Sequence, residues 1–131
     1  ATPGIRRDSR LLSPKSEWRL GPLANPLELL QPWLEAYQGA LCEPLPLLAK
    51  CSVGFAKKWR NPGRKEPIDA ARSEAALMWQ GNEHMSGEGD DPWNALAFRD
   101  REVLDERFEA LAEQLYGPAL DALHSEEEDE A

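Results

Sequence analysis

Residues 25–37 read NPLELLQPWLEAY, and this stretch indicates a largely helical fold. Asn25 followed by Pro26 is a helix-start signal, because Asn is a good N-cap residue and proline is tolerated in the first turn. Apolar residues then recur at helical spacing on one face, at Leu27, Leu30, Leu34 and Tyr37. Pro32 removes a backbone hydrogen bond, so we expect a kink or a split into two short helices there.

The remaining chain predicts further helices by the same criteria of apolar spacing and helix-end residues. An Ala-rich stretch is stopped by Gly81 and Asn82, and Gly117-Pro118 is expected to interrupt the last helix. That last helix carries an apolar stripe at Leu104, Phe108, Leu111 and Leu115. The expected helices cover about residues 52–59, 68–80, a short turn from 92, and a long element from about 100.

Two short extended segments, residues 6–12 and 17–20, flank a Ser13-Pro14-Lys15-Ser16 turn and predict a β-hairpin. Residues 44–48 alternate Pro and Leu and predict an extended, buried linker. The expected fold class is therefore α+β and mostly α-helical, with a short N-terminal β-hairpin and about five helices.

Composition limits the classes of function. A chain of 131 residues is one domain, and its longest apolar run is far shorter than the roughly 20 residues that a membrane-spanning helix needs. Cys42 and Cys51 are too few for a disulfide framework or zinc site, which favours a reduced, cytoplasmic setting. The net charge of −9 argues against a free-standing nucleic-acid binder.

Charge is unevenly distributed along the chain. Residues 126–130 are all acidic, so we expect residues 125–131 to be a disordered tail and residues 1–124 to form the domain. Lys57, Lys58 and Arg60 surround Trp59, and these four residues are candidate contacts for DNA or for another subunit. The alternative interpretation is a solvated basic surface with the tryptophan in the core.

Residues 87–93, GEGDDPW, form the most unusual segment. Glu88, Asp90 and Asp91 could bind a hard divalent cation, since carboxylates on a flexible loop suit such ions. The regular ligand spacing of a calcium-binding loop is missing, however. The favoured interpretation is a tight turn through Gly87 and Gly89, with Asp90 or Asp91 capping a helix that contains Trp93.

The sequence contains no recognisable catalytic constellation. A nuclease of the PD-(D/E)xK type needs an acid-x-Lys strand, and the nearest match, Glu17-Trp18-Arg19, has Arg in place of Lys. Neither cysteine has a local base, and His84 and His124 lack further ligands at metal spacing. We therefore assign no catalytic, cofactor-binding or metal-binding residue, and no small-molecule substrate. These features alone indicate a mostly helical interaction domain.

The order of several motifs resembles the C-terminal region of RecC chains, the gamma subunits of exodeoxyribonuclease V. Residues 9–12 (SRLL) and 17–23 (EWRLGPL) look like a hairpin near the end of that family, and 87–93 matches a Gly-Glu-x-x-Asp-x-Trp segment. Further resemblance lies in residues 37–46 (YQGALCEPLP), 51–59 (CSVGFAKKW), 75–81 (AALMWQG) and 111–120 (LAEQLYGPAL). The resemblance runs in order through nearly the whole chain.

This resemblance implies the last part of the third domain of RecC, a degenerate PD-(D/E)xK nuclease-like domain that has lost its catalytic residues. It implies a non-catalytic part of RecBCD, an ATP-dependent helicase–nuclease whose catalytic sites lie in the partner subunits and which acts in double-strand break repair and recombination. The implied partners are RecB and RecD, with RecD expected for this piece, and DNA through the whole complex. The alternatives are a metal-dependent nuclease fragment and a free-standing single-strand DNA-binding module.

Overall fold

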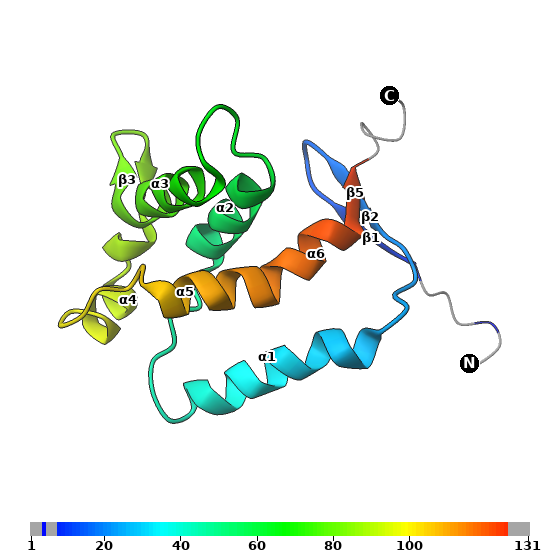
Figure 1. Cartoon of the computed structure of the whole chain (residues 1–131), viewed down its shortest axis with the longest axis horizontal. Helices are drawn as coiled ribbons and strands as arrows, with labels where there is room; N and C mark the ends of the chain where they lie inside the picture. Colours follow the sequence, from blue (N-terminus) through cyan, green and yellow to red (C-terminus); the bar gives the residue numbers. More distant parts are fainter. Residues whose placement is uncertain (1–3, 5–7, 126–131) are drawn as a thin grey trace.

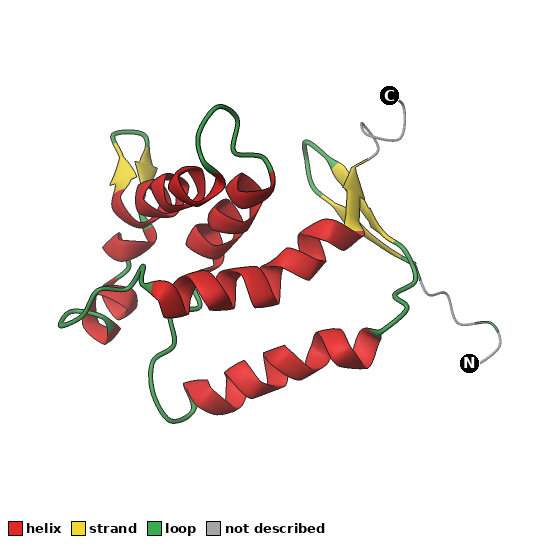
Figure 2. Ribbon diagram, viewed as in Figure 1, coloured by secondary structure: helices red, strands yellow, loops and turns green. Residues whose placement is uncertain are grey.

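The computed structural model describes residue 4 and residues 8–125, in which helices dominate and a small antiparallel sheet lies at one end (Figures 1 and 2). The predicted fold class, mostly helical with a short N-terminal hairpin, is confirmed. The acidic residues 126–130, which we expected to belong to a disordered tail, lie outside the described residues. None of the described helices is long and apolar enough to cross a membrane.

The sheet contains the predicted hairpin and one strand from the other end of the chain. Strand β1 (Ser9–Leu12) pairs antiparallel with β2 (Glu17–Leu20), and the Ser16 backbone N–H donates to Ser13 Oγ at 3.1 Å across the turn. Strand β5 (Leu123–Ser125) pairs with the other edge of β2. The sequence did not predict β5, because three residues carry too little pattern. Residues 6 and 7 of the expected first strand lie outside the described residues.

Helix α1 (Pro26–Ala40) is a single helix that runs through Pro32. The predicted split at this proline is therefore wrong. Proline in a helix interior removes one hydrogen bond, and here packing against the end of the chain offsets that loss. Trp33 of α1 meets Tyr116 edge to face, with ring centroids 5.4 Å apart.

Helices α2 (Ala49–Arg60) and α3 (Pro67–Gln80) pack side by side and form the centre of the molecule. Their interface is close because small residues line it: Ala71 and Ala75 are buried, and Gly54 lies against Glu74 and Met78. The core cluster consists of Leu48, Cys51, Phe55, Ala71, Ala75, Phe98, Val103, Phe108 and Ala112. The linker before α2 buries Pro46 and Leu48, as its Pro–Leu pattern predicts.

A compact connection follows α3. Strands β3 (Gly81–Asn82) and β4 (Met85–Ser86) form a two-residue hairpin, then a 3₁₀ turn, η1 (Glu88–Asp90), leads into the short helix α4 (Pro92–Ala97). Gly81 ends α3 with φ of 71°, a left-handed conformation that favours glycine.

One helical rod, which we call the terminal helical rod, leads into β5 and is made of α5 (Glu106–Leu111), the π-helical turn η2 (Ala112–Tyr116) and α6 (Gly117–Ala122). The helix predicted from about residue 100 begins later, because the Asp105 side chain caps it by accepting from the Phe108 N–H at 2.9 Å. The interruption predicted at Gly117-Pro118 does not occur. The wider π turn precedes Pro118, which has no backbone N–H and so cannot donate the α-helical hydrogen bond at its position.

Ser52 supplies a stability test of this packing, because it is fully buried and its hydroxyl has no hydrogen-bond partner. An unsatisfied buried hydroxyl costs about 1–3 kcal/mol. We expect Ser52→Ala to leave the free energy of unfolding unchanged or to raise it by about 1 kcal/mol, measured by urea denaturation. The control is Ser73→Ala, at an exposed position on α3. A clear destabilisation by Ser52→Ala would contradict this account of the core.

Candidate functional site

The carboxylate of Glu88 caps the N-terminus of α2 from a distant part of the chain. Its Oε1 accepts from the Lys50 N–H at 2.9 Å, and its Oε2 accepts from the Cys51 N–H at 2.8 Å. The residue at the N-cap position itself, Leu48, has no side chain that can accept these bonds. Glu88 therefore satisfies two free N–H groups and places negative charge at the positive end of the helix dipole.

The other two carboxylates of the GEGDDPW segment also bind backbone N–H groups. Asp90 accepts from the Gly87 N–H at 2.9 Å, while Asp91 caps α4 by accepting from Trp93 at 2.9 Å and Asn94 at 3.1 Å. Each of the three carboxylates thus accepts hydrogen bonds from the backbone N–H groups of a different segment. No cluster of three or more His, Cys, Asp or Glu suited to a metal ion occurs within residues 8–125.

The two glycines of this segment allow it to lie directly against the end of α3. A Cβ at Gly87 would collide with the Trp79 carbonyl oxygen, and one at Gly89 would lie 2.9 Å from the Trp79 ring. Their lack of a side chain is required by this close approach. Trp93, by contrast, projects from α4 with 77% of its surface exposed.

The cysteine beside Glu88 is poorly suited to nucleophilic chemistry. Cys51 is buried, and this burial raises the pKa of its thiol, with a further contribution from its hydrogen bond to Glu88. A thiol of this kind stays protonated near neutral pH, whereas the thiolate is the reactive form.

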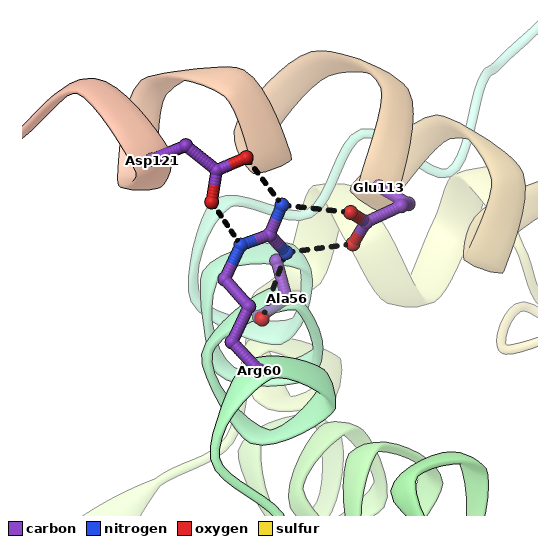
Figure 3. A network of polar contacts seen from close by, with 4 residues as sticks. All are labelled: Ala56, Arg60, Glu113 and Asp121. Atoms are coloured by element: carbon purple, nitrogen blue, oxygen red, sulfur yellow. Dashed lines mark hydrogen bonds and ion pairs between the residues drawn. The ribbon is translucent and has the colours of Figure 1, made fainter.

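The opposite end of α2 is held by Arg60, which was one of the predicted DNA or subunit contacts (Figure 3). Its guanidinium donates to Asp121 through Nε at 2.6 Å and Nη2 at 3.0 Å, and to Glu113 through Nη1 at 2.9 Å and Nη2 at 2.8 Å. A fifth bond runs from Nη1 to the Ala56 carbonyl oxygen at 3.1 Å. All five N–H groups of the guanidinium are used, so Arg60 has no donor left for a phosphate.

Gly117 makes room for this network. A Cβ at that position would lie 2.8 Å from both Arg60 Nη2 and Glu113 Oε1. The hydrogen bonds of Arg60 lower the pKa of the Asp121 carboxyl, and those of Asp121 and Glu113 raise the pKa of the Arg60 guanidinium. The network therefore favours the charged forms and joins the last turn of α2 to the terminal helical rod.

The other three predicted contact residues remain exposed at the surface. Lys57 and Lys58 lie in the last turn of α2, where positive charge suits the helix dipole. Trp59 is 41% exposed and stacks on Phe55, with ring centroids 6.1 Å apart. The buried part of the Trp59 side chain thus extends the core, and its exposed part forms a small surface with Lys57 and Lys58.

A cavity of about 620 Å³ lies between α3, α4 and the terminal helical rod. Charged side chains at its rim pair with each other: Arg72 Nε lies 2.5 Å from Glu109, and the Arg99 guanidinium contacts Asp100. The interior side is lined by aromatic core residues, including Phe55, Phe98 and Phe108. A third lining side chain, Arg101, donates to the Pro44 carbonyl oxygen at 2.6 Å. We assign no catalytic role to this cavity.

The chain is similar to the RecBCD enzyme subunit RecC of Escherichia coli (strain K12). The two are 30% identical over 120 aligned residues, which cover 85% of this chain and 10% of that relative. The chain therefore spans about a tenth of the length of the curated relative that it matches. No protein-family model matches the chain. This similarity supports the resemblance to RecC over most of the chain.

Removing the Glu88 cap should destabilise the fold. Glu88→Gln removes the charge and leaves only one acceptor oxygen for two N–H groups, so we expect a loss of about 1–2 kcal/mol in the free energy of unfolding. Urea denaturation followed by circular dichroism measures this change. The matched control is Glu83→Gln in the exposed β3–β4 turn, which should change stability little. Equal effects of the two substitutions would argue against the cap.

The Arg60–Asp121 pair should make stability depend on pH. A carboxyl whose pKa is lowered by folding stabilises the protein above its unfolded pKa, and this contribution is lost as pH falls through the folded pKa. We expect Asp121→Asn to lower the free energy of unfolding near neutral pH. The difference from wild type should shrink as pH falls below the ordinary Asp value of 3.8. Denaturation curves at several pH values test this, with exposed Asp100→Asn as control. A difference independent of pH would contradict it.

Proposed function

We propose that this chain is a non-catalytic structural and interaction part of a RecC-type subunit in a RecBCD enzyme, an exodeoxyribonuclease V acting in double-strand break repair and recombination. The observation that carries the proposal is the similarity to RecC over 85% of the chain. We assign this piece to the C-terminal domain of such a subunit, with residues 1–124 forming that domain. We also assign the protein to the cytoplasm. A degenerate nuclease-like domain is the parent fold that the family resemblance implies.

The arrangement of polar side chains supports a structural role. Glu88, Asp90 and Asp91 each accept hydrogen bonds from backbone N–H groups, and Arg60 binds two carboxylates within the chain. Groups with the chemistry to bind an ion or a phosphate are therefore used to join segments of the fold. Large apolar side chains are exposed along α1, among them Leu27, Leu30 and Leu34, and an exposed apolar face of this kind is compatible with a docking surface.

RecD is the partner that we propose for this piece, with RecB as the other candidate. Size-exclusion chromatography of the 131-residue chain with purified RecD, and separately with RecB, tests this at moderate salt. We expect a stable complex with RecD. Lys57→Glu with Lys58→Glu should weaken that complex if the exposed end of α2 takes part, whereas Arg64→Glu with Lys65→Glu in the following loop serves as the charge-matched control. Failure of both subunits to co-elute would contradict a subunit-docking role.

The same preparation distinguishes the catalytic and DNA-binding alternatives. A nuclease using Glu88, Asp90 and Asp91 would cleave DNA in the presence of Mg²⁺ or Mn²⁺. A strand-binding module using Trp59 and the neighbouring lysines would bind oligothymidine with an affinity that falls steeply with salt. We expect neither cleavage nor appreciable binding, because the carboxylates are engaged and the net charge is −9. Cleavage abolished by replacing those three carboxylates would overturn the proposal.

A further inference from the structure

The stretch that contains the β1–β2 hairpin is positively charged, although the whole chain has a net charge of −9. Residues 6–20 contain five Lys or Arg residues and two acidic residues, Asp8 and Glu17, so this stretch carries a net charge of +3. Negative charge is most concentrated at residues 126–130 (EEEDE), which we call the acidic segment. The chain therefore contains two blocks of opposite charge, one near each end of its sequence.

The two faces of the hairpin differ in chemistry. Leu11 and Trp18 lie opposite each other and line an apolar groove together with residues of α2 and α6. Successive side chains of a strand point to opposite faces, so Arg10 and Arg19 project from the other, outer face. Both arginines are exposed at the surface. The outer face of the hairpin is therefore open to a charged ligand.

The outer face places two positive charges side by side. Arg10 and Arg19 are directly opposite each other in the register of β1 and β2. Like charges at such a position repel each other and destabilise the strand pair. Arg10 Nη1 lies 3.3 Å from Glu17 Oε1, yet the Arg10 side chain stays 52% exposed, and an exposed ion pair offsets little of such a repulsion. Further carboxylates on this face would stabilise the hairpin.

The acidic segment begins beside these arginines. Strand β5 pairs with β2 in a register that places Ser125 opposite Trp18, the neighbour of Arg19 (Figure 1). Residue 126 follows Ser125 directly, and five residues of extended chain span at most roughly 18 Å. Neighbouring strands are about 4.8 Å apart, so both arginines lie within that reach. Covalent attachment gives the carboxylates an effective concentration at the hairpin on the order of millimolar.

We propose that the carboxylates of the acidic segment bind the guanidinium groups of Arg10 and Arg19 on the outer face of the hairpin. The planar guanidinium group matches the two oxygens of a carboxylate and can bind it through two parallel hydrogen bonds. In this position the acidic segment occupies an anion-binding surface and prevents acidic groups of other molecules from binding there. The contact lies within one chain, so it requires neither RecB nor RecD.

A labelled peptide with the sequence of residues 125–131 (SEEEDEA) serves as the probe. Fluorescence anisotropy at about 0.1 M salt, where the Debye length is about 10 Å, measures its binding. In the segment-neutral variant of the full chain, each Glu of residues 126–130 is replaced by Gln, and Asp129 by Asn. We expect this variant to bind the peptide at least about tenfold more tightly than the wild type, whose own acidic segment already occupies the arginines. Adding Arg10→Gln and Arg19→Gln to this variant should abolish the gain.

A matched control separates the arginine site from the net charge, because the segment-neutral variant has five fewer negative charges. The control carries the corresponding amide substitutions at five other exposed acidic positions: Glu35, Glu66, Glu83, Asp100 and Glu102. We expect at most about a twofold gain in this control, because charges more than a Debye length away are largely screened. Equal gains in the two variants, or no binding by the segment-neutral variant, would overturn the proposal.

A spin label locates the acidic segment while all of its carboxylates are present. Cys42→Ser removes the exposed thiol, Cys51 is fully buried, and Ala131→Cys carries the label directly after the segment. Paramagnetic broadening of the amide NMR signals should be strongest in residues 9–20 and should weaken at about 1 M salt, where the Debye length is about 3 Å. Circular dichroism verifies that each variant is folded.

Substitutions in the labelled chain identify the cations that hold the segment. Arg10→Gln with Arg19→Gln should reduce the broadening of the hairpin signals. Arg64→Gln with Lys65→Gln removes the same charge from an exposed loop and should leave the broadening unchanged. Broadening that is insensitive to the hairpin substitutions, or equally sensitive to both pairs, would overturn the proposal. Stronger broadening in the last turn of α2 than in the hairpin would place the segment on other cations and would also overturn it.

Discussion

The fold depends on how the two ends of α2 are held. At the N-terminus the Glu88 carboxylate binds the first free N–H groups, and at the C-terminus the Arg60 guanidinium binds Glu113 and Asp121. The partners come from the turn after α3 and from the terminal helical rod. Because α2 also carries Cys51 and Phe55 of the core, these polar contacts set the position of every helix packed around it.

Glu88, Asp90, Asp91 and Arg60 are residue types that often serve in active sites, and here each binds backbone or side-chain groups of the fold itself. A carboxylate that accepts two backbone N–H bonds, or a guanidinium with all five donors occupied, is costly to release for another ligand. Gly87, Gly89 and Gly117 belong to the same arrangement, since each leaves the space that a neighbouring polar or aromatic group fills. Residues 87–93 (GEGDDPW) therefore form a junction between α2, α3 and α4.

Helix α1 is held differently from α2, because within residues 8–125 no salt bridge joins residues 26–40 to another element. Glu43 pairs with Arg107 at 2.7 Å just after the helix, and Arg107 in turn lowers the pKa of the Glu43 carboxyl. Along its length α1 relies on apolar contacts such as Trp33 with Tyr116. On the side of α1 that faces away from these contacts, Leu27, Leu30 and Leu34 are exposed.

Local signals in the sequence were sufficient for the hairpin, the helix starts at Pro26 and Pro92, and the end of α3 at Gly81, because each depends on residues a few positions apart. The late start of α5 comes from the local cap at Asp105, and the passage through Pro118 from the π turn before it. The continuity through Pro32 depends on tertiary packing. The site could be predicted only in part. Asp91 caps the helix that directly follows it, so its role can be predicted from neighbouring residues. Glu88 bonds to Cys51, 37 residues away along the chain, and Arg60 bonds to Glu113 and Asp121, 53 and 61 residues away, so no local pattern predicts these contacts. The sequence by itself determined the helical class and the apolar face of α1. Only the tertiary structure decided that this face points to solvent and that Glu88 and Arg60 bind groups of the fold, because both follow from which segments meet in space.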